Sequence, residues 1–183
     1  MNEKTIKILL IISGSIAAYK SFDLIRKLKE GGLSISCVLT KAACNFVTPM
    51  SIASISESQV YSDLFSLKDE SEMGHIRLSR ENDLILVAPA SADLIAKMAN
   101  GLADDLASSI LLASDKPVFM VPAMNVKMWE NKAVQRNIKQ LIQDGVQFIG
   151  PVTGKLACGE EGEGRMSAIE EIIRTIKDYL KKE

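Results

Sequence analysis

The chain has 183 residues, of which 47% are hydrophobic and 25% charged, and its formal net charge is -1. These values are typical of one globular domain with a substantial core. With basic and acidic residues mixed along the chain, the charge argues against nucleic acid or an anionic membrane as a partner. With one histidine and no cysteine pair at metal-ligand spacing, no metal site is expected.

The first twenty residues combine a charged start with a short apolar run. This run ends in Gly-Ser and leads at once into an amphipathic pattern, so a first strand is favoured over a signal peptide. No segment is long and apolar enough to span a bilayer. The three cysteines, Cys37, Cys44 and Cys158, are an odd number and favour a reducing compartment, so we expect a cytoplasmic protein without disulfides.

Apolar runs of strand length alternate with helical patterns along the whole chain. Strands are predicted at residues 6–12, 33–40, 84–88, 118–121 and 146–149. Helices are predicted at 17–30 and around 41–47, 50–57, 91–99, 103–114, 131–144 and 168–182. Polar loops are expected at 66–74 and 153–165. Near-continuous apolar strands separated by helices indicate an α/β fold with a doubly wound parallel sheet, in a single domain over residues 1–183.

Small and polar residues follow the predicted strands, at the edge where doubly wound sheets bind ligands. The first strand leads into residues 13–17, the second ends at Thr40, the third leads into 89–93, and the fourth into 122–125. Gly14, Ser15 and Ile16 open a helix, whose free N–H groups suit an anion. The dinucleotide fingerprint GxGxxG is missing, which argues against NAD and leaves FMN open. A tight turn with a serine cap explains the same residues.

Three further groups have both a functional and a structural interpretation. Ser91 and Asp93 begin a helix, where they serve as cap and dipole-matched acid or meet the phosphate and ribityl chain of a flavin. His75 is a competent base near neutral pH or a structural residue. Asn125 either caps a helix or donates its amide to a carboxylate.

Cys158 lies in a glycine-rich loop that can close over a pocket. Its acidic neighbours favour the neutral thiol, that is, a proton donor; an ordinary loop cysteine is the alternative. The side chain of Cys37 is expected to be buried and to pack in the core.

Taken together, four motifs resemble the homo-oligomeric flavin-containing cysteine decarboxylases. They are PxMNxxMW at 122–129, ACGxxGxGRM at 157–166, MGHI around His75, and GSIAAYK at 14–20. The resemblance covers essentially the whole chain. It implies a flavodoxin-like, Rossmann-type three-layer sandwich, bound FMN at a subunit interface, and assembly into homotrimers or dodecamers.

The resemblance also implies an activity, the FMN-dependent decarboxylation of 4′-phosphopantothenoylcysteine in coenzyme A biosynthesis. His75 matches the family's catalytic histidine, Asn125 the asparagine that binds the substrate carboxylate, and Cys158 the cysteine that protonates a late intermediate. The positions assigned to FMN are Gly14, Ser15, Ile16, Thr40, Ser91, Asp93 and Ala123. Met124 and Ala157 are assigned to the substrate beside Asn125 and Cys158. Lys20 and Lys155 are candidates for the substrate phosphate.

Several alternatives remain at this point. A peptidyl-cysteine decarboxylase would use the same chemistry on a peptide C-terminus. The flavin prenyltransferase branch shares the fold but does not match the PAMN and ACG motifs. A non-catalytic flavin-binding regulator or electron carrier is the third alternative, and regulators typically lose one of the catalytic residues that are present here. The sequence carries no synthetase domain after residue 183, from which we expect a stand-alone decarboxylase rather than half of a bifunctional protein.

Overall fold

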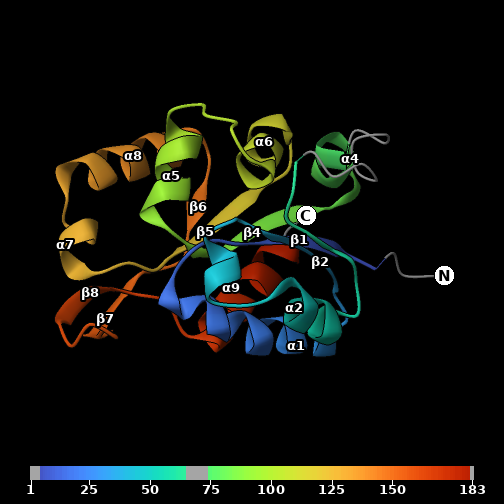
Figure 1. The fold of residues 1–183 in the computed structure, drawn as a ribbon, viewed down its shortest axis with the longest axis horizontal. Coiled ribbons are helices and arrows are strands. Elements are labelled where there is room, and N and C mark those ends of the chain that lie inside the picture. Colours follow the sequence, from blue (N-terminus) through green and yellow to red (C-terminus); the bar gives the residue numbers. More distant parts are fainter. Residues whose placement is uncertain (1–4, 65–73, 182–183) are drawn as a thin grey trace.

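A computed structural model describes residues 5–64 and 74–181. Its main feature is a six-stranded parallel sheet in the order β3-β2-β1-β4-β5-β6 (Figure 1). The strands are β1 (Lys7–Ile12), β2 (Ser34–Leu39), β3 (Val60–Tyr61), β4 (Leu84–Ala90), β5 (Val118–Pro122) and β6 (Gln147–Phe148). Without the two-residue edge strand β3, the order is that of flavodoxin-like sheets, and the winding reverses between β1 and β4. The predicted doubly wound fold is confirmed.

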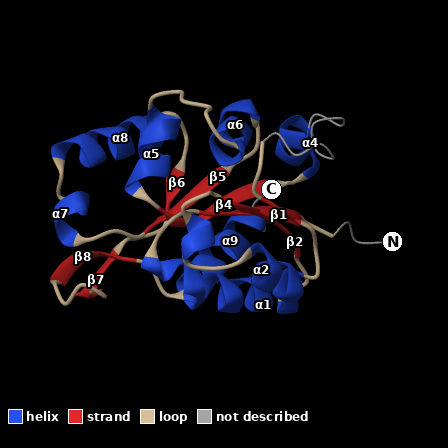
Figure 2. Cartoon of the chain, in the orientation of Figure 1, coloured by secondary structure: helices blue, strands red, loops and turns tan. Residues whose placement is uncertain are grey.

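Helices cover both faces of the sheet, which gives three layers (Figure 2). One face carries α1 (Ser21–Glu30), α2 (Pro49–Ser56) and α9 (Ile169–Leu180), and the other carries α4 (Gly74–Glu81), α5 (Ala92–Ala99), α6 (Leu106–Ala113) and α8 (Lys132–Gln143). Strand β1 shows why. Ile8, Leu10 and Ile12 pack with the first group of helices, whereas Leu9 and Ile11 pack with the second. A strand with two buried faces must be apolar throughout, and this is the pattern in the sequence.

Several predicted elements differ from those observed. The helix predicted at 17–30 is a 3-10 turn, η1 (Ile16–Lys20), followed by α1, and the one predicted at 41–47 is only the short 3-10 turn η2 (Ala43–Asn45). Strand β3 and the short helix α7 (Val126–Trp129) were not predicted. Of the loop predicted at 66–74, residues 66–73 lie outside the described part of the chain, and Gly74 is the first residue of α4.

The prediction of a loop at 153–165 was wrong. This segment contains an antiparallel hairpin of β7 (Val152–Lys155) and β8 (Glu161–Arg165). In β8, Gly162 and Gly164 alternate with exposed charged residues, so the strand period is present without any apolar side chain to reveal it. Glycine is depleted in strands, which is why the pattern suggested a loop.

Within residues 5–64 and 74–181, no helix is long and apolar enough to cross a lipid bilayer. The same residues contain no cluster of three or more side chains that could hold a metal ion.

Candidate functional site

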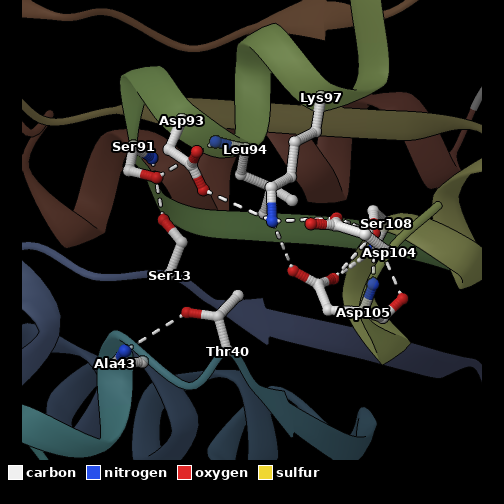
Figure 3. Close-up of polar contacts among 10 residues, drawn as sticks. All are labelled: Ser13, Thr40, Ala43, Ser91, Asp93, Leu94, Lys97, Asp104, Asp105 and Ser108. Carbon is white, nitrogen blue, oxygen red and sulfur yellow. Dashed lines mark hydrogen bonds and ion pairs between the residues drawn. The ribbon is translucent and has the colours of Figure 1, made fainter. Parts of the chain in front are cut away.

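The site lies at the carboxyl ends of β1, β4 and β5, where the sheet reverses its winding. The buried hydroxyl of Ser13 joins two of these strand ends, because Ser13 Oγ donates to the carbonyl of Pro89 at 2.7 Å. The same oxygen accepts from the N–H of Ser91 at 2.7 Å (Figure 3). The third strand end joins through the N–H of Ala123, which donates to the carbonyl of Ala90 at 3.1 Å. These bonds hold the loops that follow the strands at fixed separations.

A pocket of about 690 Å³ opens beside these strand ends, between η1, the segment before α7 and the hairpin. Its volume is in the range of cofactor and small-molecule sites. The lining residues are Gly14, Ser15, Ile16, Ala17, Tyr19, Lys20, Ser91, Ala92, Ala123, Met124, Asn125, Met128, Lys155, Leu156, Ala157, Cys158, Gly164, Arg165 and Met166. The pocket therefore brings together most of the predicted cofactor and substrate residues, from segments far apart in the sequence.

The wall formed by Gly14, Ser15 and Ser91 offers hydrogen-bond donors to a ligand. The N–H groups of Gly14 and Ser15 donate to no group in the described part of the chain. Ser15 Oγ accepts from the N–H of Ala17 at 3.2 Å, and Ser91 Oγ accepts from that of Leu94 at 3.2 Å. Both serines are therefore caps, and because each hydroxyl acts here as an acceptor, its hydrogen is still available to a bound anion.

Asn125 also acts as a helix cap, and this determines which of its side-chain atoms can bind a ligand. Its side-chain oxygen accepts from the N–H of Met128 at 2.8 Å at the start of α7. The oxygen is thus turned toward the helix, which leaves the NH₂ group of this exposed, pocket-lining residue for a ligand. An amide donor held in this way suits a carboxylate. The cap and the binding role, treated as alternatives in the sequence, are compatible in the structure.

The hairpin brings Cys158 to the same pocket. Residues 156–159 form its turn, in which the N–H of Gly159 donates to the carbonyl of Leu156 at 3.0 Å. Cys158 is exposed, and its thiol donates to Glu160 Oε2 at 3.6 Å. Cys37 has no such role, because it is buried and lies outside the pocket lining; burial raises the pKa of its thiol to about 12. Cys44 is half-buried and lies outside the pocket lining.

Gly164 fastens the hairpin to the segment that carries Asn125. Its carbonyl accepts from the N–H of Met124 at 3.0 Å, and its φ of 141° is unfavourable for residues with a side chain. A Cβ at this position would lie 2.4 Å from the carbonyl oxygen of Met124. The close approach of two backbones therefore requires glycine here.

Changing Gly164 to alanine should separate Cys158 from Asn125 without disturbing the sheet. We expect a loss in kcat/KM of about 10²-fold or more, because small misplacements of catalytic groups have effects of this size. The matched control is Gly159→Ala, whose Cβ would meet nothing within 4 Å, although the positive φ of Gly159 adds some strain. Equal activities of the Gly164 and Gly159 variants would contradict this assignment.

Two predicted cofactor residues, Thr40 and Asp93, are not among the lining residues. Thr40 Oγ1 accepts from the N–H of Ala43, the first residue of η2, at 3.2 Å. Asp93 faces Lys97, with its Oδ2 3.7 Å from the Lys97 Nζ (Figure 3). Contact of either residue with a cofactor stays a prediction.

Lys97 connects α5 to the loop before α6. Its Nζ lies 2.9 Å from Asp104 Oδ1 and 2.9 Å from Asp105 Oδ2, and its side chain is 18% exposed. Hydrogen bonds to Asp105 and Asp104 raise the pKa of Lys97. Burial by itself would raise the pKa of Asp105, but hydrogen bonds from Ser108 and Lys97 hold this pKa below its ordinary value. The lysine thus balances three carboxylates next to the helix that Ser91 begins.

Replacing Lys97 by methionine should lower the free energy of unfolding by about 1–3 kcal/mol at pH 7, because charged hydrogen bonds are lost and the three carboxylates then repel one another. A carboxyl with a lowered pKa stabilises the fold above its unfolded pKa and loses that effect as the pH falls. The difference in free energy of unfolding between the variant and the wild type should therefore become smaller below about pH 4. Urea unfolding at pH 7 and pH 3.5 measures both values. Lys139→Met, on the exposed face of α8, is the control, and an equal effect there would contradict the role of Lys97.

His75 lies in a different region. It is in the first turn of α4, and its side chain is outside the described part of the structure. Helix α4 and the hairpin are at opposite ends of the molecule (Figure 1). Asn125 and Cys158 thus share a pocket within one chain, whereas the segment with His75 does not border it.

The pocket lining also includes a cationic side chain, that of Arg165, to which the sequence interpretation assigned no role. Arg165 lines the pocket together with Lys20 and Lys155. Arg165 belongs to the ACGxxGxGRM motif, but the direction in which its side chain points depends on the hairpin. Recognising the alternation of glycine and charged residues as a strand would have predicted that direction.

A flavodoxin-like sheet with a donor-lined pocket at its switch point is the architecture of a nucleotide- or flavin-binding α/β protein. The chain belongs to the flavoprotein family, whose model matches residues 1–181.

Comparisons with individual proteins are more specific. The coenzyme A biosynthesis bifunctional protein CoaBC of Bacillus subtilis is 43% identical over 176 residues, which is 96% of this chain and 43% of that protein. The chain thus spans less than half of this curated relative. Among solved structures, a cysteine-to-serine mutant of PPC decarboxylase complexed with pantothenoylaminoethenethiol is 32% identical, with a TM-score of 0.85 over 97% of this chain and 100% of that one. The FMN-binding protein AtHal3 is 32% identical, with a TM-score of 0.86 over 98% and 99% of the two chains.

Proposed function

We propose that residues 1–183 form one FMN-binding domain that decarboxylates 4′-phosphopantothenoylcysteine to 4′-phosphopantetheine, a step of coenzyme A biosynthesis. The observation that carries this proposal is the shared pocket of Asn125 and Cys158, next to the donor groups of Gly14, Ser15 and Ser91. The similarity to CoaBC and to PPC decarboxylase supports the choice of substrate.

The residues present fit FMN. The free N–H groups of Gly14 and Ser15 and the hydroxyl of Ser91 suit a phosphate or a ribityl chain, and the small side chain of Ala123 leaves room for a flat ring. When bound, the flavin supplies a two-electron acceptor that makes the carbon bearing the sulfur electron-poor enough for CO₂ to leave.

The chain itself orients the substrate and moves protons. The amide of Asn125 binds the carboxylate that is lost as CO₂, with its direction fixed by the cap of α7. Cys158, whose thiol donates to Glu160, is assigned as the group that donates the proton to complete the thiol product. Met124 and Ala157 line the pocket beside these two residues and pack against the substrate. His75 is assigned to deprotonation or positioning of the substrate thiol.

Two measurements test this function. The purified protein should be yellow and should release FMN on denaturation. Incubation with 4′-phosphopantothenoylcysteine should yield CO₂ and 4′-phosphopantetheine. Turnover of a peptide with a C-terminal cysteine, in place of the phosphorylated substrate, would assign the protein to peptide maturation instead, and a colourless protein without turnover of either compound would contradict the proposal.

We further propose that the active site is shared between copies of the chain in a homotrimer, or in a dodecamer built from trimers. The position of α4, remote from the hairpin (Figure 1), supports a role of His75 in the pocket of another copy rather than of its own chain. Ile16 and Tyr19 line the pocket with exposures of 60% and 59%, which is apolar surface suited to cover by a cofactor or a second subunit.

Mixing two inactive variants tests this shared site. His75→Asn and Cys158→Ala subunits, unfolded and refolded together, should regain up to about a quarter of the wild-type activity, because some interfaces then combine an intact histidine with an intact cysteine. Separately refolded variants are the control. Light scattering should show a trimer or a multiple of it. A monomer, or a mixture that stays inactive, would contradict the shared site.

A cytoplasmic location is part of the proposal. All three cysteines are free, and Cys158 is exposed, which is compatible with a reducing compartment.

A further inference from the structure

The pocket contains positive charge without a matching negative charge. Lys20, Lys155 and Arg165 line it, and no aspartate or glutamate is among the described lining residues. Within the part of the chain that the structure describes, none of the three makes an ion pair or a side-chain hydrogen bond. Lys20 is half-buried and unpaired, whereas the half-buried Lys29 and Lys97 are paired with acids. Lys155 and Arg165 are exposed. Unpaired cations in a pocket indicate an anionic ligand.

Two of these cations are held close together. The side chain of Arg165 crosses the hairpin diagonally and passes over Gly154 of β7, where an added Cβ would lie 3.2 Å from both Cδ and the guanidinium nitrogen Nη1. Glycine at 154 thus leaves the space that the arginine occupies. Burial, and secondly the charge of Arg165, lower the pKa of Lys20. The two groups repel each other in the free protein, and a bound anion relieves that repulsion.

We propose that Lys20 and Arg165 form a subsite for a phosphate monoester, which rests on the proposed function and extends it. Arginine binds phosphate through two parallel hydrogen bonds, and lysine adds a point charge. Both the substrate and FMN carry a phosphate monoester. The substrate is favoured on position, because Arg165 lies on the hairpin that carries Cys158, whereas the free N–H groups that suit the flavin phosphate follow β1.

Binding of unreactive ligands to the FMN-loaded protein tests the subsite. The probes are 4′-phosphopantothenate and pantothenate, which lack the cysteine and differ only in the phosphate. In Lys20→Gln and Arg165→Gln we expect Kd for 4′-phosphopantothenate to rise about 10- to 100-fold by calorimetry, with Kd for pantothenate unchanged. Arg136→Gln removes an exposed arginine from α8 and should change neither value.

A second arm separates the two sources of phosphate. Each variant is freed of flavin and reconstituted with FMN or with riboflavin. If the subsite binds the substrate phosphate, the affinity of each variant for both flavins should equal that of the wild type. A selective loss for FMN would keep the phosphate subsite and assign it to the flavin. Unchanged affinities for both phosphorylated compounds in both variants would overturn the proposal.

The charge-conserving variants Arg165→Lys and Lys20→Arg are controls for loss of folding. They should retain most of the preference for 4′-phosphopantothenate over pantothenate. The outcome is also separable from the proposed activity. A wild-type protein that prefers 4′-phosphopantothenate through these residues but releases no CO₂ from 4′-phosphopantothenoylcysteine would support the subsite and contradict the decarboxylase assignment.

Discussion

Replacing Asn125 by aspartate is expected to reduce kcat/KM by about 10³-fold while leaving stability unchanged, because a carboxylate would then face the substrate carboxylate. The structure makes this substitution unusually selective. Asparagine and aspartate are equally good N-caps, and the oxygen that accepts from Met128 is present in both. The variant should therefore keep α7, its FMN and its thermal midpoint, and lose only the donor to the substrate.

Asn125→Ser is the matched control for charge, since serine caps the helix but neither donates an amide N–H nor repels a carboxylate. Its loss of activity should be clearly smaller than that of the aspartate variant. Steady-state kinetics with 4′-phosphopantothenoylcysteine, together with the FMN content and thermal unfolding of each variant, provide the comparison. An aspartate variant with a normal KM and kcat would remove Asn125 from the carboxylate site.

In the Cys158→Ser and Cys158→Ala variants, CO₂ release and formation of the saturated thiol should become uncoupled. Loss of a general acid costs roughly 10²- to 10⁴-fold in the step that it serves. Under the proposed roles, Asn125 still binds the carboxylate, so decarboxylation should proceed and an unsaturated enethiol with two hydrogens fewer than the product should accumulate. The solved PPC decarboxylase structure, a cysteine-to-serine mutant with pantothenoylaminoethenethiol, provides a precedent for such a compound.

Mass spectrometry of single-turnover mixtures distinguishes the enethiol from 4′-phosphopantetheine. Cys44→Ser is the control, because this half-buried cysteine lies outside the pocket lining and its change should leave the product unaltered. Complete conversion to 4′-phosphopantetheine by Cys158→Ala would show that another group donates the proton.

The strands of the sheet, apart from the short edge strand β3, were predictable because their burial leaves a direct trace in the sequence. Strand β4 is buried at every position and appears as the apolar run at 84–88. The hairpin was not predictable in the same way. Its period of two is carried by glycines and charged residues, and its position depends on backbone contact between Gly164 and Met124. Such contacts join segments 40 residues apart and leave no local pattern.

The candidate site shows the same division. The side chains that could carry chemistry, Asn125 and Cys158 among them, follow from motifs and from the rule that parallel strands deliver ligands at their carboxyl ends. The role of Asn125 could not be separated from capping until the structure showed which of its atoms the helix uses. Likewise, the sequence contains His75 but does not place it relative to the pocket; in the structure α4, which carries His75, lies at the opposite end of the molecule from the hairpin (Figure 1).

The sequence alone determined the five main strands of the sheet and the helices α1, α2, α5, α6, α8 and α9, together with the apolar core of the sheet and the residue types at its functional edge. Each of these depends on local periodicity or on chemical identity. Only the tertiary structure decided that Arg165 joins Lys20 in the pocket, that Thr40 and Asp93 lie outside its lining, and that α4 is remote from the hairpin. These relations depend on how the hairpin and helices pack, and packing between distant segments is set by the whole fold rather than by any stretch of the chain.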